Sequence, residues 1–63
     1  MRVKFGKRIY LCTIATCSGD CMLLTTNNGF YTVVFESDEA AQHCHTFLLE
    51  NGYYDFSNCN YSN

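Results

Sequence analysis

The chain has 63 residues, of which 48% are hydrophobic and 16% aromatic, and its formal net charge is −2. This composition excludes intrinsic disorder, which goes with low hydrophobicity and high net charge, and so short a chain has room for one domain with a thin core. No stretch approaches the roughly 20 apolar residues that a membrane helix needs.

The first eight residues are basic, as the start of a signal peptide is. The apolar stretch behind them is interrupted by polar residues, namely Thr13, Thr16, Ser18 and Asp20, and it has the composition of a strand. We therefore expect no secretion signal, no membrane partner and a cytoplasmic protein. In a reducing compartment, the five cysteines are expected to be thiols or metal ligands rather than disulfides.

Three strands are predicted in the first half of the chain. Arg8–Thr16 is rich in β-branched and aromatic residues, and Met22–Thr26 and Phe30–Glu36 follow it with the same character. Residues Arg2–Phe5 offer an additional short strand. Between the second and third strands, Asn28-Gly29 predicts a tight hairpin turn of type I′, in which both central residues have positive φ.

A helix is predicted next, because the hydrophobic spacing changes. Ser37 is a good N-cap, and Asp38 and Glu39 lie in the first turn, where the helix dipole favours negative charge. The helix should run to about Glu50, and Asn51-Gly52 should end it. Its apolar face is expected to hold Ala40, Ala41, Cys44, Phe47 and Leu48.

Residues Tyr53–Ser57 predict a last strand, and residues 58–63 are expected to form a frayed tail. The sequence therefore predicts a single small α+β domain over residues 1–63. Its expected order is β-β-β-α-β, with a three-stranded antiparallel meander, one helix packed on one face of the sheet, and a C-terminal strand.

Alternation along the strands sorts the predicted sheet into two faces. The face expected to lie under the helix consists of Tyr10, Cys12, Ile14, Met22, Leu24, Tyr31, Val33 and Phe35. The opposite face consists of Ile9, Leu11, Thr13, Ala15, Leu23, Thr25, Phe30, Thr32 and Val34, with Cys17 and Cys21 at one end. A single helix covers only one face, so the second face should remain open.

The open face is the main candidate for a binding site, because it is half apolar and has no charged residue within its strands. Large exposed apolar patches on soluble proteins mark contact surfaces. The residues expected to contact a protein partner or a second copy of the chain are Leu11, Thr13, Leu23, Thr25, Phe30, Thr32 and Val34. The alternative is an ordinary solvent face, since threonine suits exposed strands.

Cys17 and Cys21 are a second candidate. If Ser18–Asp20 is a three-residue loop, the two cysteines face each other and supply half of a tetrahedral zinc site, which the same pair from a second subunit would complete. His43 and His45 are two residues apart on the predicted helix and cannot share an ion. Free thiols remain the favoured alternative to zinc, and a disulfide between the pair is the third.

The four basic residues are Arg2, Lys4, Lys7 and Arg8, and all lie at the start of the chain. Together with neighbouring aromatic residues they suggest binding of DNA or RNA. The overall negative charge weighs against this alternative.

No set of residues with catalytic roles is evident, so we expect no enzymatic activity and no obligate cofactor. The leading hypothesis is a small interaction module that inhibits or modulates a macromolecular partner sterically and self-associates through the open face. It is similar in kind to the small modulators that phages and mobile elements encode. The alternative is a nucleic-acid-binding or zinc-linked module that uses the basic N-terminus with Cys17 and Cys21.

Overall fold

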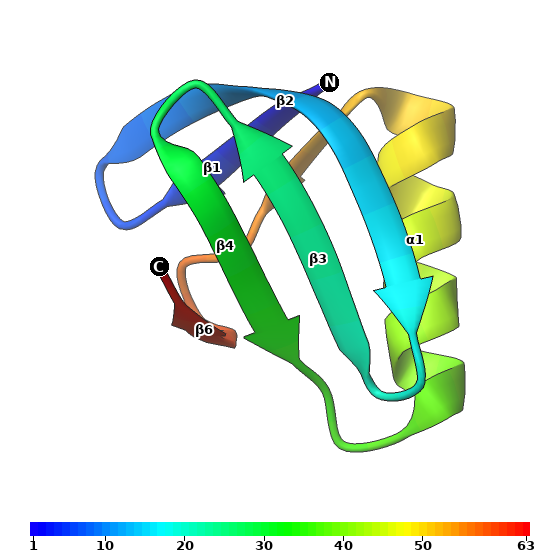
Figure 1. Cartoon of the computed structure of the whole chain (residues 1–63). Helices are drawn as coiled ribbons and strands as arrows, with labels where there is room; N and C mark the ends of the chain where they lie inside the picture. Colours follow the sequence, from blue (N-terminus) through cyan, green and yellow to red (C-terminus); the bar gives the residue numbers. More distant parts are fainter.

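The computed structural model describes residues 1–63 and contains six strands and one helix (Figure 1). The strands are β1 (Arg2–Phe5), β2 (Arg8–Ser18), β3 (Cys21–Thr26), β4 (Gly29–Val34), β5 (Tyr53–Asp55) and β6 (Asn60–Ser62). The helix α1 (Asp38–Asn51) lies between β4 and β5. The α+β class and the three-stranded meander with one helix are confirmed, the optional strand Arg2–Phe5 is present as β1, and β6 extends the sheet beyond the predicted strands.

All strands belong to one sheet in the order β5-β1-β2-β3-β4-β6. Neighbouring strands pair antiparallel, except that β1 and β5 are parallel. The long strand β2 pairs first with β1 and then with β3, and its register shifts between Cys12 and Ile14. This β-bulge leaves Thr13 without a cross-strand partner and bends the strand, as bulges do, and Figure 1 shows the bend where β2 turns to run beside β3.

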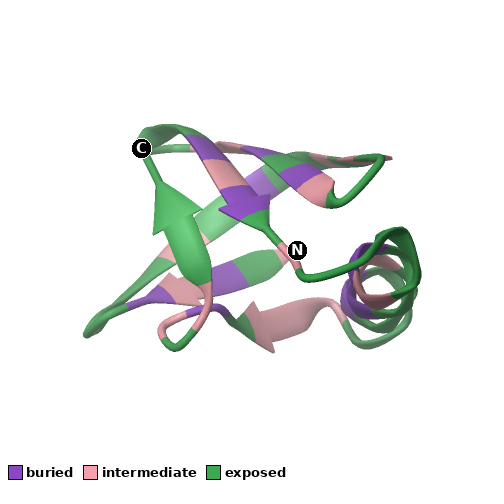
Figure 2. Ribbon diagram, turned by 90° about the horizontal axis from the view of Figure 1, so that it is seen from below, coloured by how far each residue is buried: buried purple, intermediate pink, exposed green.

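The sheet curls around its own core. Figure 2 shows the strands curved around a common interior with α1 at one side. The rings of Phe5 on β1 and Tyr31 on β4 stack at 4.1 Å, although β2 and β3 separate their strands in the sheet. The Phe56 ring also stacks with Phe5, with 5.4 Å between the ring centroids. The remaining buried core consists of Val3, Cys12, Met22, Leu24, Val33, Cys44 and Leu48.

The helix closes the core against β2, β3 and β5. It begins as predicted, because the Ser37 hydroxyl accepts a hydrogen bond from the Ala40 N–H at 3.1 Å. It ends at Gly52, whose φ of 70° is the left-handed conformation in which glycine is favoured. Ala41, Cys44 and Leu48 are buried on its inner face.

The predicted register between β2 and β3 agrees with the observed pair of Cys12 and Thr26 but is wrong by one residue from Ile14 onward, beyond the bulge at Thr13. Cys21 pairs with Ser18 rather than Cys17, because the hairpin closes through a two-residue turn at Gly19-Asp20. A one-residue shift exchanges the faces of a strand. Ile14, expected under the helix, is therefore 58% exposed on the other side. Ala15 was expected on the open face and instead packs against the core.

The register between β3 and β4 differs from the prediction by two residues, which preserves the faces. Thr26 pairs with Gly29, so Asn27 and Asn28 occupy the turn. Neither asparagine has positive φ, so the turn is not the predicted type I′; Gly29 alone takes positive φ, at 97°. The Thr26 hydroxyl fixes this turn by accepting from the Asn28 N–H at 3.0 Å and donating to the Gly29 carbonyl at 2.8 Å.

Part of the tail expected to be frayed forms strand β6. It pairs antiparallel with β4, whose edge would otherwise lack a partner. Tyr61 shares the inner face with Val33, its pairing partner, and its ring lies 4.7 Å from that of Phe5. The chain's single helix lacks the length and apolar character needed to cross a lipid bilayer.

Candidate functional site

The outward side of β2, β3 and β4 is a continuous surface that no other element covers, and we call it the outer face. Cross-strand pairing arranges its side chains in three rows. The middle row is Thr16, Leu23 and Thr32; the rows on either side are Ile14, Thr25 and Phe30, and Ser18, Cys21 and Val34. Leu11 and Ile9 continue this surface along the first half of β2.

Hydrophobic side chains on the outer face are strongly exposed. The exposed fraction is 58% for Ile14, 46% for Leu23, 75% for Phe30 and 41% for Val34. Threonines lie between them, and none of the three rows contains a charged residue. An apolar sheet surface without charges is well suited to pack against another protein surface.

The structure brings the seven predicted contact residues together on this side of the sheet. Leu11 is 59% exposed beside the bulge, and Thr13 at the bulge donates its hydroxyl to the Thr25 carbonyl at 3.4 Å. Leu23, Phe30, Thr32 and Val34 lie within the rows. The prediction missed Ile14, because a bulge at Thr13 has no signature in the residues around it.

Basic and acidic side chains gather at opposite ends of the molecule. Arg2 and Lys4 alternate with the buried Val3 and Phe5 along β1, so both point outward, and Lys7 and Arg8 follow at the β1–β2 turn. All four basic residues therefore lie in this hairpin, which we call the basic hairpin. The Arg2 guanidinium lies over the Tyr53 ring, 5.8 Å from its centroid, an arrangement that favours the cation.

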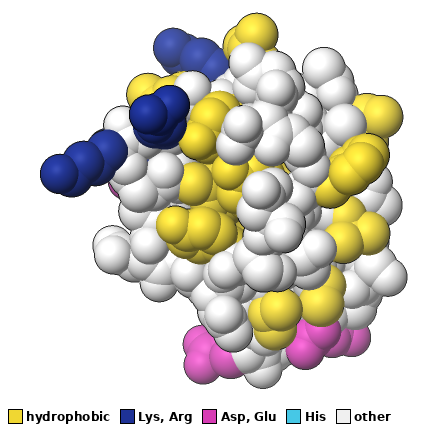
Figure 3. Space-filling model, turned by 60° about the vertical axis from the view of Figure 1, so that its left-hand side comes forward, with side chains coloured by type: hydrophobic (Ala, Val, Ile, Leu, Met, Phe, Trp, Pro, Cys, Tyr) yellow, Lys and Arg dark blue, Asp and Glu magenta, His cyan; other side chains and the backbone are white.

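Four of the six acidic residues lie at the other end of β2. Asp20 is in the β2–β3 turn, and its carbonyl accepts the Phe35 N–H at 2.8 Å, which fixes the start of the β4–α1 connection beside it. Glu36, Asp38 and Glu39 follow in that connection and in the first helical turn. We call this group the acidic end. Figure 3 shows the basic and acidic side chains at opposite ends, with hydrophobic side chains between them.

Asp55 lies apart from the acidic end, opposite Lys4 on the neighbouring strand. The pKa of its carboxyl is lowered, first because the Ser57 hydroxyl donates to it at 2.6 Å, next because the Ser57 N–H donates at 2.9 Å, and also because Lys4 is near.

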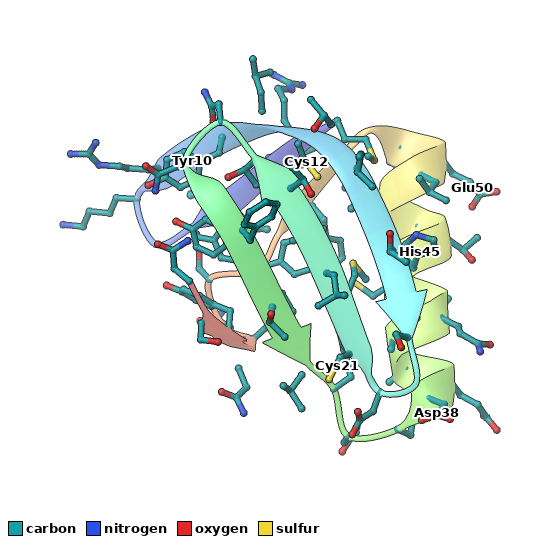
Figure 4. All side chains as sticks on the ribbon, viewed as in Figure 1. Tyr10, Cys12, Cys21, Asp38, His45 and Glu50 are labelled. Carbon is teal, nitrogen blue, oxygen red and sulfur yellow. The ribbon has the colours of Figure 1, made fainter.

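Cys17 and Cys21 do not face each other. Cys17 pairs with the buried Met22 and shares its inward direction, whereas Cys21 belongs to the outer face. Figure 4 shows Cys21 at the same end of the molecule as Asp38. All five cysteines are free, and no three His, Cys, Asp or Glu residues are grouped to hold a metal ion.

A shallow apolar groove of about 530 Å³ lies between α1 and the segment around β5 and β6. It is lined by Phe35, Ala40, His43, Cys44, Phe47, Tyr54 and Cys59. Burial raises the pKa of the Cys44 thiol to about 11. Burial, followed by the charge of Asp55, also raises the pKa of Cys59. A raised pKa lowers the thiolate fraction at neutral pH, so neither thiol is activated as a nucleophile.

No family model, no curated protein and no solved structure matches this chain. The candidate surfaces are therefore defined by their own geometry. The outer face combines exposed hydrophobic side chains, a sheet surface without charges and charged groups at both ends. The groove is lined by hydrophobic residues and His43, and neither of its thiols is activated.

Proposed function

We propose that the chain is a small protein-interaction module that binds a macromolecular partner through its outer face and acts by steric occlusion. The observation that carries this proposal is the exposure of Ile14, Leu23, Phe30 and Val34 together on one uncovered sheet surface. An inhibitor or modulator of this type needs no catalytic group, because covering the partner's surface is its activity. Five free thiols suit a cytoplasmic location for such a module.

A sheet is a suitable platform for this purpose. Backbone hydrogen bonds to β2 and β4 hold the middle strand β3 on both edges, so the side chains of the outer face are ordered before binding. Preorganised side chains lose less conformational entropy when a partner binds. Phe30 and Leu23 are the natural anchors, since large apolar groups that become fully desolvated contribute most to binding.

Site-specific photo-crosslinking in the native host tests this proposal. A photoreactive residue at Thr16, which is exposed in the middle row of the outer face, should give a covalent product with a protein partner. The matched control is the same residue at Gln42, which is exposed on α1 away from the sheet. Adding Leu23→Lys should remove the Thr16 product, because a buried lysine without an ion partner is costly.

Equal products from Thr16 and Gln42, or a Thr16 product that survives Leu23→Lys, would refute binding through the outer face. The mass of the product also identifies its occupant, since a crosslink to a second copy and a crosslink to another protein differ in mass.

Binding of single-stranded nucleic acid is the second candidate, and the basic hairpin favours it. Arg2, Lys4, Lys7 and Arg8 are gathered with the exposed Ile9 and the Tyr53 ring under Arg2. Contacts of this kind to phosphates weaken steeply with salt. The proposal predicts that the free chain binds a single-stranded oligonucleotide at low salt and that changing all four residues to Gln abolishes binding. If the unmodified chain does not bind the oligonucleotide at low salt, the proposal of nucleic-acid binding is refuted. The related alternative, a nucleic-acid-binding module with zinc at Cys17 and Cys21, is refuted by the same result.

A further inference from the structure

The outer face is complementary to itself. Its rows are apolar, the basic hairpin lies beyond the row of Ile14, Thr25 and Phe30, and the acidic end lies beyond the row of Ser18, Cys21 and Val34. Strand β2 connects the two ends, from Arg8 to Ser18. Opposite charges at opposite ends of one surface are the condition for pairing with an inverted copy.

A two-fold axis that lies in the plane of the interface and runs across the strands, along the middle row, turns one outer face onto the other and exchanges the two ends. In a dimer with this symmetry, the same patch contacts itself in both copies. An axis near Leu23 places the middle row against its own copy. The bulky row with Ile14 and Phe30 then meets the smaller row with Cys21 and Val34, so size as well as charge is complementary. The basic hairpin of each copy comes over the acidic end of the other.

The opposite orientation is disfavoured by charge. If two outer faces met with the same ends together, Lys7 and Arg8 of one copy would approach the same residues of the other. Like charges that meet across an interface repel each other and suppress the wrong orientation. Charge therefore selects the inverted arrangement, while the apolar rows supply the binding energy.

The size of the face is adequate for a stable dimer. A standard interface buries about 800 Å² on each partner, which is about one-fifth of the 4096 Å² surface of this chain. The molecule measures 26 × 23 × 17 Å between Cα atoms, and the outer face spans three neighbouring strands, of which β2 has 11 residues. Small domains with thin cores commonly gain stability by oligomerisation.

We propose that the free protein is an antiparallel two-fold dimer in which the outer faces of two copies meet and the basic hairpin of each lies over the acidic end of the other. This inference rests on the proposed function of the outer face, and it states that a second copy of the chain covers that face when no other partner is bound. A foreign partner that uses the same face must compete with the second copy, so self-association regulates the site.

Sedimentation equilibrium of the purified chain in reductant tests the dimer. The unmodified protein should be dimeric, and raising the salt from about 0.1 M to about 1 M should weaken the dimer about tenfold, because the end-to-end charges are screened. Leu23→Lys should be monomeric. The control is Leu49→Lys on the outward side of α1, where Leu49 is 54% exposed; this variant should remain dimeric.

Charge reversal distinguishes the orientation and does not depend on the folding of a face variant. One variant, Lys7→Glu with Arg8→Glu, has acidic residues at both ends; the other, Asp20→Lys with Glu36→Lys, has basic residues at both ends. Each alone should dimerise at least about tenfold more weakly than the unmodified chain. An equimolar mixture should recover dimers that contain one copy of each variant.

If the unmodified chain is monomeric at all accessible concentrations, the proposal of an antiparallel dimer is overturned. It is also overturned by a dimer that salt strengthens, that Leu23→Lys leaves intact, or that either charge-reversed variant forms at full affinity. The proposed function is decided separately by the Thr16 crosslink. If the chain is monomeric and Thr16 still crosslinks to a different protein in a Leu23-dependent manner, the dimer fails and the interaction module stands.

Discussion

His45 is the side chain that ties the helix to the sheet by a hydrogen bond. Its Nε2 lies 2.8 Å from the Ala15 carbonyl oxygen on β2, and because a carbonyl only accepts, Nε2 must carry the hydrogen. Figure 4 shows the imidazole between α1 and the sheet. The sequence did not reveal this role, since Ala15 was assigned to the wrong face.

Replacing His45 by Ala should lower the free energy of unfolding by about 1 kcal/mol, the net value of one such hydrogen bond together with the unpaired carbonyl it leaves. Urea denaturation monitored by circular dichroism measures this change. His43→Ala is the matched control, because His43 is exposed two residues away on the same helix. Equal losses for both variants would show that the hydrogen bond contributes nothing specific.

The thiol of Cys44 makes stability depend on pH. Burial raises its pKa from the ordinary 9.0 to about 11, so the folded state holds the thiol proton more firmly than the unfolded state does. The resulting stabilisation is fully present below pH 9.0 and is lost as the pH rises through about 11.

In that alkaline range, the free energy of unfolding of the unmodified chain should fall more steeply with pH than that of Cys44→Ala. Urea denaturation in reductant at several pH values gives both slopes. Tyr54 and Cys59, the other titrating groups of the groove, remain in both proteins. Parallel slopes would mean that the Cys44 thiol ionises as readily in the folded chain as in the unfolded one.

Among the secondary-structure elements, β6 is held in place by its single aromatic side chain. The Tyr61 ring is 37% exposed, and its centroid lies 4.7 Å from that of Phe5 and 6.3 Å from that of Tyr31, whereas Asn60 and Ser62 beside it are exposed and make no aromatic contact. We expect Tyr61→Ala to destabilise the fold by about 1 to 2 kcal/mol, since aromatic pairs add to the value of the buried area. Ser62→Ala should cost much less in the same denaturation experiment. If both variants are neutral, β6 does not contribute to the stability of the core.

The end of α1 is a second point at which an element depends on one residue. Gly52 has φ 70°, its N–H donates to the Leu48 carbonyl at 2.8 Å, and its own carbonyl accepts from the Arg2 N–H at 2.8 Å. A Cβ at this position would meet no atom within 4 Å, so Gly52→Ala carries only the conformational cost. We expect a loss of about 1 kcal/mol in thermal or urea unfolding, and Gly52→Asn should lose less, because asparagine tolerates this conformation better. Equal stability of Gly52→Ala and the unmodified chain would contradict this account.

Local sequence signals predicted the elements well where one residue decides the conformation. Ser37 and Gly52 set the helix ends, and the alternation in β3 identified Met22 and Leu24 as core. The signals failed where pairing depends on distant strands. The extra residue at Thr13 is accommodated because β2 must serve both β1 and β3, and the polar segment around Tyr61 becomes a strand only because β4 offers it an edge.

At the scale of the whole molecule, the open face was predictable because the sequence predicts one sheet and only one helix to cover it. One helix covers one side of a sheet, and the shift of two residues between β3 and β4 left every face assignment there unchanged. The gathering of charge at two ends was only partly predictable. The basic residues are contiguous in the sequence, whereas Asp20 joins Glu36 and Asp38 only because the β2–β3 turn lies beside the β4–α1 connection.

The proposed antiparallel dimer makes the thermal stability of the chain depend on protein concentration. Anything that binds the folded state alone stabilises it by mass action, and the second copy is such a ligand.

For a domain of this size, each tenfold increase in concentration should raise the unfolding midpoint of the unmodified chain by about 3 to 5 °C. The variant with Lys7→Glu and Arg8→Glu should show a midpoint that depends less on concentration, although its core is unchanged. Mixing it with the Asp20→Lys, Glu36→Lys variant should restore the dependence. A concentration-independent midpoint for the unmodified chain would instead mean that the monomer is the unit that folds, and that the outer face awaits a different protein.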